Sequence, residues 1–113
     1  MNITTESYGH AVILILKGDL LEDAIEPLRQ AVDHQLANKE VIDIVLNLEN
    51  VPFIDSKAME YLLDLQDKLA ERLGQVRFVK CDENIRKILE ITRLDSVFEV
   101  FDDVTEAVKA VEV

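Results

Sequence analysis

Hydrophobic positions along the chain switch repeatedly between strand-like and helix-like spacing. The run "AVILIL", residues 11–16, is apolar on both faces and predicts a strand buried on both sides. Residues 3–8 predict a weaker strand, and Tyr8-Gly9-His10 supplies a turn, so the two segments are expected to form an antiparallel hairpin. Residues 42–48 alternate between an apolar and a mixed face, which is typical of a strand with helices mainly on one side.

Two longer segments have helical spacing. In the first, Asp23 and Glu26 have the spacing of a capping box, and Pro27 is expected in the first turn. The second covers residues 56–73 and is stopped by Gly74. Its predicted apolar side consists of Met59, Leu62, Leu63, Leu69 and Leu73.

The remaining third of the chain repeats the alternation. Residues 76–79 and 97–101 predict short strands, and a helix that starts at Asp82 or Asn84 lies between them. A last helix opens at Asp103 and carries the apolar positions Ala107, Val108 and Val111. The order predicts an α/β fold: a mixed, mostly parallel five-stranded sheet with an N-terminal β-hairpin and about four helices mainly on one face.

Composition narrows the functional classes. The chain has 113 residues, of which 49% are hydrophobic and 31% charged, and predicts one folded domain over residues 1–113. A formal net charge of −11 disfavours nucleic acid and anionic membrane surfaces as partners. The acidity either provides solubility or meets a basic patch on a protein partner. No apolar run approaches the roughly 20 residues that cross a bilayer, and the first residues lack a secretory signal, so a cytoplasmic protein is expected.

The sequence offers no motif for catalysis, a cofactor or a metal. The sequence contains neither of the Gly-rich phosphate-binding motifs GxxxxGK[ST] and GxGxxG. Ser56 does not lie in the GxSxG motif that positions a catalytic serine. The two histidines, His10 and His34, are expected in the hairpin turn and on the first helix, exposed to solvent. The only cysteine, Cys81, follows an apolar run and is expected to be buried. The residues alone therefore give no support for an enzyme.

Asp55 and Ser56 are the chemically distinctive pair. Both residue types are favoured at the start of a helix, so one of them is expected to cap the helix that follows. The pair also lies at the carboxyl end of a predicted parallel strand, where open α/β sheets place their functional sites. Free backbone N–H groups at such a helix start can stabilise a phosphate.

These residues carry a family resemblance. "IVLNLENVPFIDSKAMEYLL" resembles the signature of STAS domains, the anti-sigma factor antagonists, in which a strand reading like "VLDLSGV" precedes "FIDSSGLG". "LKGDLLEDAIEPLRQAV" is similar to the family's strand, glycine turn and first helix. "ILEITRLDSVFEVFDD" is similar to its C-terminal "TGL" and "FD" run, with Arg93 in place of the glycine. The resemblance covers about residues 12–108.

The resemblance implies partner switching controlled by phosphorylation. Ser56 holds the position that a partner serine kinase, itself the anti-sigma factor, phosphorylates in the family, and a PP2C-type phosphatase would reverse the step. The implied partner-binding residues are Asp55, Ser56, Lys57, Ala58, Met59 and Glu60. Lys57, Ala58 and Glu60 depart from the family's small residues. The alternative is therefore a STAS scaffold or accessory subunit that is not phosphorylated, in a lipid-transport ABC complex or a stress-sensing assembly.

Overall fold

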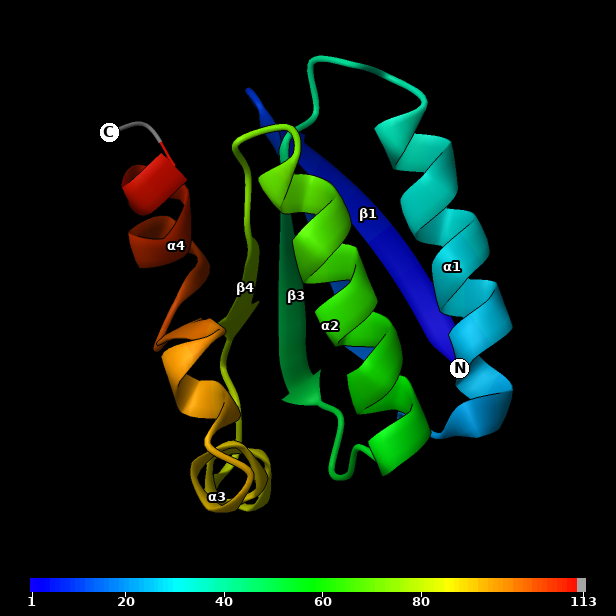
Figure 1. The fold of residues 1–113 in the computed structure, drawn as a ribbon, viewed down its shortest axis with the longest axis vertical. Coiled ribbons are helices and arrows are strands. Elements are labelled where there is room, and N and C mark those ends of the chain that lie inside the picture. The colour runs from blue at the N-terminus through cyan, green and yellow to red at the C-terminus, as the bar shows by residue number, and fades with distance from the viewer. Residues whose placement is uncertain (112–113) are drawn as a thin grey trace.

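A computed structural model describes residues 1–111, with side chains described up to residue 109. The chain alternates strands and helices in the predicted order, with one additional turn of 3-10 helix, η1 (Figure 1). The elements are β1 (Asn2–Tyr8), β2 (Ala11–Lys17), α1 (Glu22–Leu36), β3 (Asp43–Asn50), α2 (Ser56–Ala70), β4 (Val76–Val79), α3 (Glu83–Ile91), η1 (Leu94–Ser96), β5 (Glu99–Phe101) and α4 (Val104–Val111). The side chain of Val111, placed by the sequence on the apolar side of the last helix, lies outside the described residues.

The five strands form one sheet in the order β1-β2-β3-β4-β5. β1 pairs with β2 antiparallel, from Tyr8 opposite Ala11 to Asn2 opposite Lys17, and every other pair is parallel. Gly9 occupies the hairpin turn with a φ of 58°, a conformation in which glycine avoids the clash of a Cβ atom. The predicted mixed sheet with an N-terminal hairpin is confirmed. Within the described residues, no helix is both long and apolar enough to span a bilayer.

Helices cover the two faces of the sheet unequally. Figure 1 shows α1 and α2 side by side across one face, and their buried residues join those of α3 in the larger core. On the other face, Val45 of β3 packs with Ile13, Val79 and Ala107, the last of which belongs to α4. The expectation of helices mainly on one face is confirmed, and α4 explains why β2 is buried on both sides.

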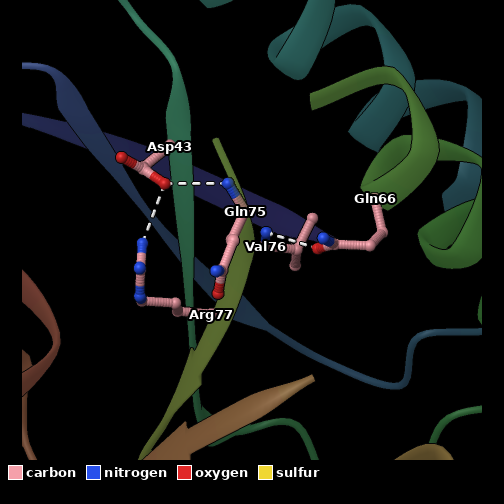
Figure 2. A network of polar contacts seen from close by, with 5 residues as sticks. All are labelled: Asp43, Gln66, Gln75, Val76 and Arg77. Carbon is pink, nitrogen blue, oxygen red and sulfur yellow. Dashed lines mark hydrogen bonds and ion pairs between the residues drawn. The ribbon is translucent and has the colours of Figure 1, made fainter. Parts of the chain in front are cut away.

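A buried ion pair fixes β4 against β3 (Figure 2). Asp43 Oδ1 accepts hydrogen bonds from Arg77 Nη1 and from the backbone N–H of Gln75, both at 2.8 Å. On the helix side, Gln66 Oε1 accepts from the backbone N–H of Val76 at 2.7 Å. These contacts satisfy two backbone donors at the start of β4, where a slip by one residue would turn each side chain to the opposite face.

The start of α1 differs from the prediction. The helix begins at Glu22, and the N-cap residue Leu21 offers no side-chain hydrogen bond. The predicted capping box of Asp23 and Glu26 is therefore wrong, and Pro27 lies in the second turn rather than the first. The side chain that caps this helix is that of Asp55, which lies far from it in the sequence.

The end of α2 also differs from the prediction. The helix ends at Ala70, three residues before the predicted Leu73, which is 91% exposed and adopts a left-handed φ of 64°. Gly74 then passes so close to the residue before β3 that a Cβ atom on it would lie 1.7 Å from the Ile42 carbonyl oxygen. Close backbone approach, rather than a helix stop alone, therefore requires glycine at this position.

Arg93 occupies the left-handed position that follows α3. Its φ is 62°, and it comes directly after the C-cap residue Thr92. Helices commonly end on glycine in this conformation, so the arginine bears a steric cost that glycine avoids. The chain then enters η1, and β5 begins only at Glu99, two residues after the predicted Val97.

We predict that Gly74→Ala lowers the free energy of unfolding by about 3 kcal/mol or more, because the methyl group must displace the backbone of Ile42. Gly9→Ala is the matched control: it meets no atom within 4 Å and costs only about 1 kcal/mol for the left-handed φ. Urea denaturation followed by circular dichroism measures both values. Equal losses in the two variants would contradict the proposed close approach.

Candidate functional site

Two loops at the carboxyl edge of the sheet hold the predicted site. The loop after β2 and the loop after β3 pair through a single bridge between Leu20 and Ile54. The Leu20 N–H donates to the Phe53 carbonyl oxygen at 2.9 Å, and the Asp55 N–H donates to the Leu20 carbonyl oxygen at 3.1 Å. The start of α2 is therefore fixed to the start of α1 before any side chain contributes.

Asp55 caps both helices with one carboxylate. Its Oδ1 accepts from the Ala58 N–H at 2.8 Å, and its Oδ2 accepts from the Glu22 N–H at 2.9 Å. The predicted cap on α2 is confirmed. The sequence did not predict the cap on α1, because Glu22 lies 33 residues from Asp55 and a contact over that distance has no local sequence pattern. Two orphan N–H groups of two helices are thus satisfied by a single side chain.

The same two helices are also held together at their other end. Arg72 in the turn after α2 donates from Nη2 to the Leu36 carbonyl oxygen at 2.9 Å and from Nη1 to the Val41 carbonyl oxygen at 3.0 Å. Those bonds satisfy acceptors at and beyond the end of α1. Because α1 and α2 are tied at both ends, the surface at their N-termini is preformed.

Midway along the pair, the Arg29 guanidinium lies over the Tyr61 ring, 5.2 Å from its centroid. Lys68 of α2 pairs with Asp33 of α1 at 3.5 Å. Burial, followed by the Asp33 charge, raises the pKa of the Tyr61 hydroxyl to about 12. Tyr61 is therefore neutral at physiological pH and acts as a packing residue between the helices.

Ser56 is exposed and is the first residue of α2. The Asp55 cap takes the N–H of Ala58, whereas the first N–H groups of a helix have no partner within the helix. In Figure 1, β3 ends at the same edge where α2 begins, which places Ser56 at the carboxyl edge of the sheet. The geometry suits a hydroxyl that must be reached by another protein.

The other predicted contact residues divide by exposure. Lys57 and Glu60 are exposed and form an ion pair at 3.8 Å. Ala58 and Met59 are 1% and 6% exposed and belong to the core. The Ala58 methyl group thus fills no space at the surface, and of the three departures beside Ser56 only Lys57 and Glu60 protrude.

A hollow of about 240 Å³ lies beside Ser56, between α2 and α3. Apolar side chains dominate its walls. The sequence shows an apolar residue on each helix, Leu63 and Ile88, but no local spacing predicts that these two helices approach each other. The main lining residues are Ile54, Met59, Leu63 and Ile88, with Ser56 and Glu60 at the rim.

Other candidate chemistry is weak. Cys81 is buried as expected, and burial raises the pKa of its thiol to about 11, so the reactive thiolate is scarce at neutral pH. His10 lies in the turn and contacts the Glu40 carbonyl oxygen at 3.1 Å through Nδ1. Across the part of the chain that the structure describes, no three His, Cys, Asp or Glu residues gather as metal ligands do.

Comparisons with known proteins agree with this fold. The family model described as "STAS domain" matches residues 2–107. The chain is 24% identical to the anti-sigma F factor antagonist of Paenibacillus polymyxa, over 100% of this chain and 98% of that protein. An anti-sigma factor antagonist of Mycobacterium paratuberculosis has a similar crystal structure, with a TM-score of 0.85, 21% identity and coverage of 99% and 94%. The Bacillus cell fate determinant SpoIIAA in its phosphorylated form gives a TM-score of 0.74, 22% identity and coverage of 97% and 99%.

We predict that Asp55→Ala lowers the free energy of unfolding by about 2 kcal/mol, because two helix caps of about 1 kcal/mol each are lost. Asp82→Ala is the matched control and costs about 1 kcal/mol, because Asp82 accepts only from the Ile85 N–H. Asp55→Asn, which keeps one acceptor oxygen, falls between Asp55→Ala and the wild type. Urea titration measures all three, and a loss in Asp55→Ala no larger than in Asp82→Ala would rule out the double cap.

Proposed function

The chain belongs to the STAS domain family, and on that basis we propose that it is an anti-sigma factor antagonist, a binding protein without a catalytic step. The partner is an anti-sigma factor that is also a serine kinase, and the site of action is the cytoplasm. Support comes from a curated relative of that name that aligns over 98% of its own length. The acidic surface of this chain, with a net charge of −11, suits a basic docking face on the partner.

The observation that carries the proposal is the position of Ser56. Its exposed hydroxyl opens α2 beside Asp55, at the carboxyl edge of the sheet. In the proposed switch, the kinase transfers the γ-phosphoryl group of ATP to Ser56 Oγ, and ADP and a proton are released. A PP2C-type phosphatase returns the serine by hydrolysis.

The phosphate is expected to act on docking rather than on folding. It adds about −1.5 to −2 charges at a helix N-terminus, where the helix dipole and free N–H groups stabilise an anion. Lys57 can turn from Glu60, its exposed partner at 3.8 Å, toward the new charge. On the partner's side, the phosphate adds bulk and charge to a surface that must lose its water. A loss of about 3 kcal/mol weakens binding more than a hundredfold.

The alternative of a constitutive scaffold or accessory subunit has one observation in its favour. Lys57 and Glu60 place two long, charged side chains beside Ser56, where the family pattern has small residues. Such side chains hinder close approach by a kinase and suit a fixed interface. The two functions differ in whether the state of Ser56 alters partner binding.

Affinity capture with this protein as bait should isolate the partner kinase. We predict that this kinase, supplied with ATP, adds one phosphate to the wild-type protein and none to the Ser56→Ala variant. Ser7→Ala, which alters an exposed serine on β1, is the matched control and is phosphorylated like the wild type. Affinity capture and mass spectrometry identify the partner and the modified residue.

Ser56→Asp should weaken capture of that partner about a hundredfold, because it introduces a negative charge at the docking surface. Capture that persists unchanged in Ser56→Asp, together with an unmodified Ser56, would refute the switch and favour the accessory subunit.

A further inference from the structure

An open groove of about 610 Å³ runs along the β5 edge of the sheet, between β5 and α3. Its floor is apolar and its rim is acidic. Leu89 and Phe98 are buried in the floor and Val100 is half-buried, whereas Glu90, Asp95 and Glu99 are exposed at the rim. A hollow of this volume falls within the range of ligand-binding pockets, about 300 to 1,000 Å³.

The backbone of β5 has unused pairing groups at this edge. The Phe101 carbonyl oxygen accepts from the Lys80 N–H at 3.1 Å, so the N–H and C=O groups of Phe101 are directed toward β4. These directions alternate along a strand, so the corresponding groups of Val100 are directed away from β4, toward the open edge. An exposed edge of this kind can pair with an extended segment of another chain.

The charges at the rim select the kind of segment. Arg86 is the one cation among the described residues that line the groove, and its Nη2 already bonds to Asp102 at 2.9 Å. Three carboxylates therefore face the groove with little compensation. The groove at the opposite edge, between β1 and α1, has about 550 Å³ and no carboxylate among its described lining residues. The acidic rim is thus a property of the groove at β5 and not of the groove at β1.

We infer that the groove between β5 and α3 is a second docking surface, which binds an extended basic segment of a protein partner. The segment pairs with the backbone of Val100, packs its apolar side chains on Leu89 and Phe98, and directs its lysines or arginines to the acidic rim. α3 separates this groove from the hollow beside Ser56, because Ile88 lines that hollow and Leu89 lines this groove. Binding here is therefore independent of Ser56.

The test uses an acetylated and amidated peptide of alternating lysine and valine, added to the full chain at about 0.15 M salt to screen distant charges. Nuclear magnetic resonance should show shifts at Glu90, Asp95 and residues 99–101, and slower hydrogen exchange at the Val100 amide. Peptide binding to Ser56→Ala is unchanged. A peptide of alternating glutamate and valine does not bind.

Glu99→Lys is expected to weaken binding of the lysine–valine peptide about tenfold or more. Glu6→Lys is its matched control, because it reverses an exposed glutamate on the other edge strand, β1, with the same change in net charge. Val100→Pro removes the outward N–H and should also weaken binding, with thermal unfolding as the check on its fold. Equal losses in Glu99→Lys and Glu6→Lys, or shifts spread over the whole acidic surface, would overturn the proposal.

Discussion

The double cap made by Asp55 is the contact on which the site depends. Each of its two carboxylate oxygens accepts one backbone N–H, and the two donors belong to helices that begin 34 residues apart, at Glu22 and Ser56. The half-buried carboxylate of Asp55 is thus engaged by the N-termini of two helices. Ser56, the next residue, is held in position as a result. The helix that begins at Ser56 cannot rotate without breaking the hydrogen bond between Asp55 and the Glu22 N–H of α1. The acid before the serine is therefore part of the fold as well as part of the proposed docking site.

Signals that are local in sequence predicted most of the architecture. The apolar run of β2, the turn at Gly9 and the alternation of strands with helices were sufficient for the mixed sheet. Asp82 and Asp103 cap α3 and α4 as residue type and spacing suggest, because a cap and its N–H lie three residues apart. The resemblance then supplied what periodicity does not: a reason to single out Ser56 among exposed serines.

Contacts between distant segments explain what the sequence did not predict. The predicted start of α1 was wrong because the side chain that caps this helix comes from Asp55. The predicted end of α2 was also wrong, and the turn that follows the helix brings Gly74 against Ile42. The mixed face of β3 was read correctly as polar in part, but the pairing of Asp43 with Arg77 joins two strands and has no signature in either. At the site, the predicted residues differ in exposure: Ser56, Lys57 and Glu60 lie at the surface, whereas Ala58 is buried beneath it.

Among residues 1–111, three residues other than glycine adopt a left-handed conformation, and they have a consequence for the evolution of this chain. Leu73, Lys80 and Arg93 have φ values of 64°, 57° and 62°, and each conformation costs roughly 1 kcal/mol that glycine would avoid. Natural proteins sit close above the stability that selection demands. Substitution of glycine at any one of these positions is therefore expected to raise the stability of the fold. Such substitutions can offset destabilising changes around Ser56 if the proposed docking surface changes there.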